Sequence, residues 1–183
     1  GLAAGSEPVA FTVTGVNDAP GLTAIEAGQL VYTENDPATP ITTSLVVTDV
    51  DSATLASATV ALTANYVPTE DTLSFTTLGN IIGSWDGGSG VLTLSGIDTV
   101  AAYQTALRSV SYQNTSDDPN TGVRTISIQV NDGALSSGLV QRDIRVDAVA
   151  DAPILANVEG SALLYTENDP ATQITSTLTM SDP

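Results

Sequence analysis

Oxygen-bearing acidic residues are the side chains of this chain that could do chemistry, and they stand in short clusters at the ends of apolar, strand-like runs. Asp49 and Asp51 lie one residue apart directly after such a run, and Asp132 follows another. The pair Asn17-Asp18 precedes the dipeptide Ala-Pro. A hard cation such as Ca²⁺ takes six to eight oxygen ligands in a flexible geometry. Carboxylates gathered this closely repel one another, so we expect a divalent cation to bind among them.

The same residues have a plainer interpretation, because aspartate and asparagine side chains favour turns at the ends of strands. Glu34 lies in the sequence Tyr-Thr-Glu-Asn-Asp-Pro, which is also a reasonable turn. The pair Asp117-Asp118 predicts a solvated loop. Trp85 could form a platform that stacks on a sugar, but its place in an apolar run predicts core packing.

The composition excludes several classes of function. The 183 residues include 21 acidic residues and four arginines, with no lysine, histidine or cysteine, and the formal net charge is −17. Binding of nucleic acid or of an anionic membrane needs cationic side chains, so neither is an expected partner. The common nucleophile–base pairs cannot form, and a glycosidase-like carboxylate pair would need a cleft with aromatic walls. We therefore predict that the chain is not an enzyme, and we expect no membrane insertion by this segment.

An ungapped internal repeat organises the chain. The stretch YTENDPAT occurs at 32–39 and again at 165–172, an offset of 133 residues. Over residues 18–49 against 151–182, 18 of 32 positions are identical at that offset. An ungapped period of this length indicates a tandem array of small domains.

The repeat also predicts the domain boundaries. Residues 1–18 match the end of a unit, since VAFTVTGVNDAP stands where RDIRVDAVADAP recurs one period later. Residues 19–150 form one complete unit, which is large enough for a core of its own. Residues 151–183 match only the beginning of a following unit. We interpret the chain as a segment of a longer repetitive protein, or as a subunit whose ends are completed by neighbours.

The apolar pattern predicts an all-β fold. Runs with β-branched residues and period-two alternation are expected to form strands. One segment, 98–110, instead spaces Val100, Tyr103, Leu107 and Val110 three or four residues apart, which predicts a short amphipathic helix capped by Asp98 or Thr99. Together these patterns favour an antiparallel β-sandwich of immunoglobulin-like kind with one short helix. The expected strands are 41–48, 57–64, 73–77, 91–96, 124–132 and 139–149.

The order of motifs in the complete unit resembles that of a cadherin-type repeat, as found in large bacterial surface proteins and adhesins. That family has Pro-Glu-Asn near the start, Asp-x-Asp after the second strand, Leu-Asp-Arg-Glu mid-domain, Ala-x-Asp-x-Gly late, and an acidic exit motif ending in proline. The corresponding stretches here are 33–35, 49–51, 97–100, 130–133 and 147–153, in the same order.

The resemblance implies a set of calcium ligands at each junction between units. At the first junction it implies Asn17 and Asp18 with Asp49, Asp51 and Asp132. At the second it implies Glu34, Asp98, Asp147 and Asp151, with Asp182 from the next unit. Thr14, Val100 and Ala150 stand where the family has further ligands, so we expect fewer ions at each junction than the family's full complement.

The resemblance also implies a function. We expect a structural module of an extracellular adhesin or surface filament, in which Ca²⁺ stiffens the junctions and the partners are neighbouring repeats or copies of the same chain. Two alternatives stay open. One is a module whose loops bind a glycan or a protein receptor, and the other is a filament subunit whose incomplete ends complete a neighbour's sandwich by strand addition.

Overall fold

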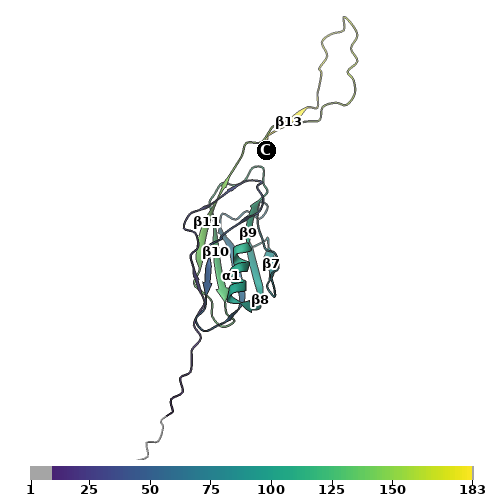
Figure 1. Ribbon diagram of the computed structural model, residues 1–183. Helices are drawn as coiled ribbons and strands as arrows, with labels where there is room; N and C mark the ends of the chain where they lie inside the picture. Colours follow the sequence, from purple (N-terminus) through teal and green to yellow (C-terminus); the bar gives the residue numbers. More distant parts are fainter. Residues whose placement is uncertain (1–9, 183) are drawn as a thin grey trace, which may run out of the picture.

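The computed structural model describes residues 10–182, and the chain folds as an all-β protein with one helix in that part. Figure 1 shows a single layered body with the helix α1 lying against a sheet. The elements are β1 (Gly21–Thr23), β2 (Leu30–Thr33), β3 (Thr39–Pro40), β4 (Val46–Thr48), β5 (Thr54–Ala64), β6 (Asp71–Ser74), β7 (Ile82–Asp86), β8 (Val91–Thr99), α1 (Val100–Ser109), β9 (Ser111–Asn114), β10 (Arg124–Asn131), β11 (Val140–Asp147), β12 (Ile154–Ala156) and β13 (Thr179–Ser181).

The main layer is a six-stranded sheet with the order β2-β11-β10-β5-β8-β7. The pairs within it are antiparallel except for β2 and β11, which run parallel with Leu30 opposite Ile144. The three-stranded sheet β3-β9-β6 and the pair β1-β4 supply the other strands of the complete unit, and β12 pairs with β13. The predicted antiparallel β-sandwich class is confirmed.

The long strands follow the predicted runs closely. β5, β6, β8, β10 and β11 each begin and end within three residues of the expected boundaries. Alternation explains this agreement, because Ile126, Ile128 and Val130 of β10 all point to one face and are buried. The strands β2, β7 and β9 were not predicted from the sequence, nor were the short strands β1, β3, β12 and β13.

The predicted strand 41–48 is wrong over most of its length, since only β4, Val46–Thr48, is extended and paired. The carboxylate of Glu26 accepts hydrogen bonds from the backbone N–H groups of Thr43 (2.8 Å) and Ser44 (3.1 Å). The hydroxyl of Thr42 accepts from the N–H of Leu45 (3.2 Å). Side chains therefore satisfy the backbone donors that a neighbouring strand would otherwise accept.

The predicted helix is confirmed at Val100–Ser109, with Thr99 as its N-cap. The Thr99 hydroxyl accepts a hydrogen bond from the N–H of Ala102 at 3.1 Å. The expected apolar face is buried at Tyr103 and Leu107, which pack into the core beside β4, β5 and β8. The helix is the longest local element of the second layer.

Replacing the cap by Thr99→Ala is expected to lower the free energy of unfolding by about 1 kcal/mol, because an N–H in the first turn loses its acceptor. Thr105→Ala is the matched control, since Thr105 is exposed within the helix and alanine has the higher helix propensity. Urea unfolding followed by circular dichroism measures both. A Thr99→Ala loss no larger than that of Thr105→Ala would contradict the capping role.

The hydrophobic core lies between the six-stranded sheet and the layer of α1 and the shorter strands. Its buried side chains run from Tyr32 to Val146 and include Leu45, Leu55 and Tyr112. Tyr32 and Tyr112 pack edge to face with ring centroids 5.1 Å apart. Residues 10–18 leave one end of this body and residues 151–182 extend from the opposite end (Figure 1). Among residues 10–182, no helix is long and apolar enough to cross a membrane.

Candidate cation sites at the two ends of the sandwich

The structure brings together all five residues predicted for the first junction. Asn17 donates from its amide to Asp132 Oδ2 at 2.8 Å, and the backbone N–H of Asp18 donates to Asp51 Oδ2 at 3.0 Å. Asp51 in turn donates its backbone N–H to Asp49 Oδ1 at 3.2 Å. The linker that precedes β1 is thus tied to the β4–β5 loop and to the end of β10. This set, Asn17, Asp18, Asp49, Asp51 and Asp132, is the first-end cluster.

Asp49 is the member of the first-end cluster whose hydrogen bonding is incomplete. Its Oδ1 atom also accepts from the N–H of Ser52 at 2.8 Å. Its Oδ2 atom is buried and has no hydrogen-bond partner. A buried carboxylate oxygen without a hydrogen-bond partner costs free energy. Its position in the first-end cluster makes this oxygen a candidate ligand for a cation.

Asp132 is fixed by its own loop. Its Oδ1 accepts from the backbone N–H groups of Ala134 (2.6 Å) and Leu135 (2.8 Å). These bonds, with that of Leu135 the largest cause and that of Asn17 the next, hold the pKa of Asp132 below its ordinary value. The carboxylate therefore stays ionised to lower pH than a free aspartate and keeps its negative charge at this end.

The second end holds Glu34, Asp147 and Asp151. Glu34 follows β2 and is only 5% exposed. Its Oε1 atom accepts from the backbone N–H of Val149 at 2.6 Å, while Oε2 is buried without a partner. Asp151 Oδ2 is likewise buried without a partner. These residues, Glu34 and Asp151, are the second-end pair.

Asp147 is already neutralised by a neighbour. Arg145 Nε lies 2.8 Å from Asp147 Oδ1, and Arg145 Nη2 donates to Oδ2 at 2.9 Å. Both side chains are about half exposed. This ion pair was not predicted from the sequence, although the spacing i, i+2 on one strand places two side chains on the same face.

The assignment of Asp98 to the second junction is wrong. Asp98 lies on β8 opposite Leu55 at the start of β5, only four residues beyond Asp51, and therefore at the first end. Its Oδ2 accepts from the N–H of Asn80 and its Oδ1 from that of Thr99. The bonds from Asn80 and Thr99, in that order, lower the pKa of Asp98. Because β8 runs antiparallel to β5, its last residues return to the end where β5 begins.

Asp182 follows β13 directly and is exposed. Because Ile154 pairs with Ser181 in an antiparallel register, Asp182 lies at the end of the β12–β13 pair where β12 begins, the end that Asp151 precedes. The corresponding pairing of Gly21 with Thr48 lies beside the first-end cluster. The second junction therefore repeats the strand arrangement of the first.

Neither end is a closed metal cage. Within residues 10–182, no three Asp, Glu, His or Cys side chains are close enough together to hold an ion by themselves. A cation bound at either end would need carbonyl oxygens, the Asn17 amide or water to complete its shell, which suits Ca²⁺ better than ions that demand rigid geometry. The chemistry of the donors fits, and the number of carboxylates is low.

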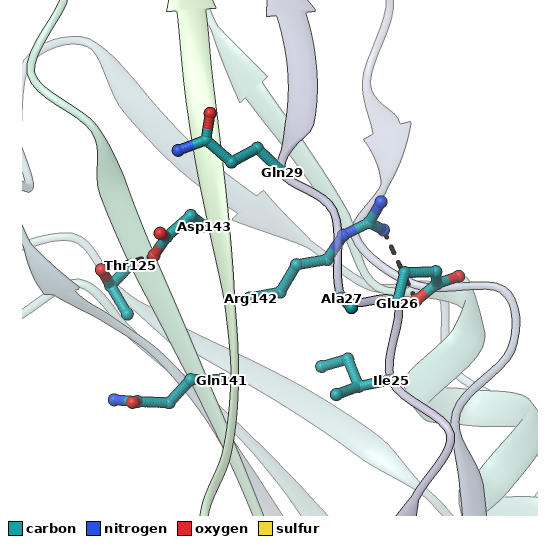
Figure 2. A pocket seen from close by; sticks show the side chains of 8 residues that line it. All are labelled: Ile25, Glu26, Ala27, Gln29, Thr125, Gln141, Arg142 and Asp143. Atoms are coloured by element: carbon teal, nitrogen blue, oxygen red, sulfur yellow. Dashed lines mark hydrogen bonds and ion pairs between the residues drawn. The ribbon is translucent and has the colours of Figure 1, made fainter.

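A separate cleft of about 470 Å³ is lined by residues of the segment before β2 and by residues of β10 and β11. Figure 2 shows Arg142 reaching from β11 towards Glu26, with Gln29, Gln141 and Asp143 around it. The Arg142 Nη1 atom lies 3.5 Å from Glu26 Oε2. The residues that line the cleft include no aromatic ring. Trp85 lies elsewhere, packed edge to face on Tyr66 and against the core, as its place in the sequence predicted.

Comparisons with known proteins add no family assignment. No protein-family model matches the chain, and no curated protein matches it with significant similarity. The case for a function therefore depends on the repeat, the fold and the geometry of the two ends.

Proposed function

We propose that this chain is a structural tandem repeat of an extracellular adhesin or surface filament, and that Ca²⁺ binds at the ends of each β-sandwich and stiffens the junctions. Its partners are then neighbouring repeats or copies of the same chain. Calcium is available at millimolar concentration outside cells, where weak, exposed sites of extracellular modules operate. The inventory of side chains, without His, Cys or Lys, favours a mechanical role over a catalytic one.

One observation supports this proposal above the others. The buried side-chain oxygen atoms without a hydrogen-bond partner in residues 10–182 belong to Glu34, Asp49 and Asp151. All three residues are predicted calcium ligands, and they lie at the two ends where adjacent units meet. Unpaired buried oxygens are rare in folded proteins, so their coincidence with the predicted ligands favours a cation as the missing partner.

At the first end, the chain's own residues already connect the linker to two loops. Asn17 is hydrogen-bonded to Asp132, and Asp18 is hydrogen-bonded to Asp51. A cation bound by both Asp49 and Asp51 would therefore restrain the same linker. Bound Ca²⁺ would supply the positive charge that offsets the repulsion between these carboxylates. The linker would then lose freedom, and two successive units would behave as one stiff rod.

At the second end, Glu34 performs the equivalent connection. Its Oε1 atom holds the N–H of Val149 in the linker, and its Oε2 atom stays open beside it. Asp151, further along the same linker, offers a second open oxygen. Asp147 could join only after leaving Arg145, which predicts a weaker site at this end.

Calcium is expected to raise the free energy of unfolding. The effect of Asp49→Asn on that free energy is expected to differ in sign between chelator and calcium. At a calcium concentration ten times the dissociation constant, a single site adds about 1.4 kcal/mol to the free energy of unfolding. In chelator, Asp49→Asn should be neutral or stabilising, because it removes a negative charge whose Oδ2 atom is buried without a partner, while the amide oxygen can still accept from Asp51 and Ser52. In calcium, the same variant should be less stable than the parent chain. Thermal melting with and without chelator measures both.

Asp86→Asn is the matched control for this experiment. Asp86 is the last residue of β7, which forms the opposite edge of the six-stranded sheet from β2 and Glu34, and its carboxylate accepts from Gly88 and Ser89. Its effect on stability should be equal in calcium and in chelator. Small-angle scattering of the chain should also report a longer, stiffer particle in calcium. Melting that is insensitive to chelator, together with unchanged scattering, would refute the proposal.

A further inference from the structure

The second copy of the repeat, residues 151–182, folds locally like the first. The Tyr165 hydroxyl donates to the carbonyl of Asp169, and the N–H of Asp169 donates to the carbonyl of Thr166. Glu159 accepts from the N–H of Ser176 at 2.7 Å. The same bonds occur 133 residues earlier, from Tyr32 to Asp36, from Asp36 to Thr33, and from Thr43 to Glu26.

The two copies differ in what covers them. Tyr32 and Ile41 are each 2% exposed in the first copy, whereas their counterparts Tyr165 and Ile174 are 56% and 84% exposed. Leu164 is 92% exposed, and its counterpart Val31 is already 53% exposed in the first copy, so this position faces solvent in both. The second copy therefore has the local shape of the first but presents its apolar side chains to solvent.

In the first copy, β9 and β11 both cover this surface: Tyr32 packs on Tyr112 of β9, and β11 contributes an arginine and two apolar residues. Arg142 donates from Nη1 to the carbonyl of Ile41 at 2.6 Å and from Nε to the carbonyl of Gly28 at 3.1 Å. It also pairs with Glu26, as Figure 2 shows. Ile144 and Val146, two and four residues further along, are buried, while the strand runs parallel to β2.

The second copy has an open cavity at the equivalent place. The cavity measures about 370 Å³, and Glu159, Ser161, Leu163 and Ile174 are among the residues that line it. At the offset of 133, Glu159 corresponds to Glu26, Ser161 to Gly28, and Ile174 to Ile41. These are the three residues whose counterparts hold Arg142. The cavity is therefore lined by the residue equivalent to Glu26 and by the two residues whose counterparts accept from Arg142 through their backbone carbonyls.

We propose that this cavity is a receiving site for an extended strand with the chemistry of β11, an arginine followed at the second and fourth positions by apolar residues. The strand runs parallel to residues 163–166, with its arginine on Glu159 and on the carbonyls of Ser161 and Ile174. The register follows from the first copy, where Val31 lies opposite Arg145. Its counterpart Leu164 then lies opposite the residue three positions after the incoming arginine. This inference goes beyond the proposed calcium function and does not depend on it.

The predicted strand carries an arginine equivalent to Arg142, and the apolar segment of residues 10–14 in this chain has no such arginine in front of it. By sequence, Phe11 and Val13 correspond to Ile144 and Val146, so residues 10–14 share the apolar alternation of β11. The position that corresponds to Arg142 is a valine. Pairing by residues 10–14 of a second copy would bury apolar surface but would leave Glu159 without a cation, so we expect it to be the weaker occupant.

Disulfide trapping tests the site and its register. The chain contains no cysteine, so Leu164→Cys introduces a single thiol at an exposed position. The probe is a peptide of residues 139–149 with cysteine in place of Arg145. Adjacent strands place facing Cα atoms about 4.8 Å apart, which a disulfide can span. We expect cross-linking at least about tenfold faster than with a peptide whose cysteine replaces Asp143, two positions out of register.

Two controls make the result specific. Val31→Cys puts the thiol at the same place in the first copy, where β11 already occupies the site, and should react at least about tenfold more slowly. A peptide in which Arg142 is also replaced by alanine, and a peptide of residues 9–16 with cysteine in place of Thr12, should both react more slowly than the arginine-bearing probe. All reactions are run in chelator, so that the outcome is separate from calcium binding.

Equal rates for all peptides, or for Leu164→Cys and Val31→Cys, would overturn the proposal. A faster reaction of the 9–16 peptide would also overturn it and would instead favour head-to-tail pairing of two copies. Nitrogen-15 chemical-shift changes on adding the cysteine-free 139–149 peptide to the unmodified chain provide a second measurement. They should be confined to residues 159–176, and changes spread over the complete unit would contradict the assigned site.

Discussion

Arg124→Met is expected to lower the free energy of unfolding by about 3–5 kcal/mol, because it leaves a buried carboxylate without its cation. Arg124 is fully buried, and its Nε atom lies 3.2 and 3.1 Å from the two carboxylate oxygens of Asp71. Its Nη2 atom pairs with Glu70 at 3.1 Å, and Nη1 donates to the carbonyls of Asn120 and Gly122. A loss of this size is about a fifth or more of the free energy of unfolding of a typical domain.

The remaining bonds to Asp71 explain why the loss should be large. Tyr112 donates its hydroxyl to Asp71 Oδ1 at 2.6 Å, and Asn114 donates its amide at 2.9 Å. Burial, and then the Asp71 carboxylate, raise the pKa of Tyr112 well above its ordinary value, so the hydroxyl stays a donor. Both carboxylate oxygens of Asp71 have partners in this network, and removing its single cation leaves a buried negative charge.

Arg145→Met is the matched control for Arg124→Met. Arg145 also pairs with an aspartate through two bonds, but both side chains are about half exposed, and we expect a loss below about 1 kcal/mol. Urea unfolding of both variants gives the comparison. Adding Asp71→Asn to Arg124→Met should recover part of the loss, because the buried group is then neutral. Equal losses for the two arginine variants would contradict the structural role given to Arg124.

Acid is expected to destabilise the chain partly through Glu26. Burial acts to raise the pKa of Glu26, but hydrogen bonds from the Thr42 hydroxyl and the Thr43 N–H, with Arg142 nearby, outweigh it and lower the pKa to about 2 from an ordinary value of 4.5. A group whose folded pKa is lowered stabilises the fold above its unfolded pKa. That contribution is lost as the pH falls from about 4.5 towards 2.

Glu26→Gln isolates this contribution. A pKa shift of this size corresponds to at most about 3 kcal/mol, and the partial exposure of the side chain reduces our expectation to about 2 kcal/mol at neutral pH. The difference in stability between Glu26→Gln and the parent chain should shrink towards zero between about pH 4.5 and pH 2. Urea unfolding at a series of pH values measures it.

Asp118→Asn serves as the control for Glu26→Gln, because Asp118 lies exposed in the loop before β10. Its effect on stability should be within about 0.5 kcal/mol and constant over the same pH range. The difference in free energy of unfolding between Glu26→Gln and the parent chain could instead be independent of pH. That result would mean that the hydrogen bonds of this side chain to Thr42, Thr43 and Ser44 stabilise the fold without any contribution from its charge. That outcome would contradict the electrostatic explanation.

Local sequence patterns predicted which residues of the candidate sites lie beside strand ends, but not which of them are neighbours in space. Asp49 and Asp51 follow a short apolar run, and Asn17-Asp18 precedes Ala-Pro, so their positions beside strand ends could be read directly. In the structure Asn17 contacts Asp132 and Asp18 contacts Asp51, while a calcium site built from these residues stays a prediction. Asp98 shows the limit, since nothing near it in the sequence reveals that β8 pairs antiparallel with β5.

The sequence by itself determined the 133-residue repeat, the helix Val100–Ser109 and the long strands β5, β10 and β11, because periodicity and capping depend on residues within a few positions of each other. Only the tertiary structure decided that β2 lies parallel to β11, that Glu26 replaces strand pairing at residues 42–44, and that Arg124 meets Asp71 inside the core. The physical reason is that strand order, strand direction and the partner of a buried charge depend on contacts between residues far apart in the chain. Those contacts form only when the whole sandwich closes.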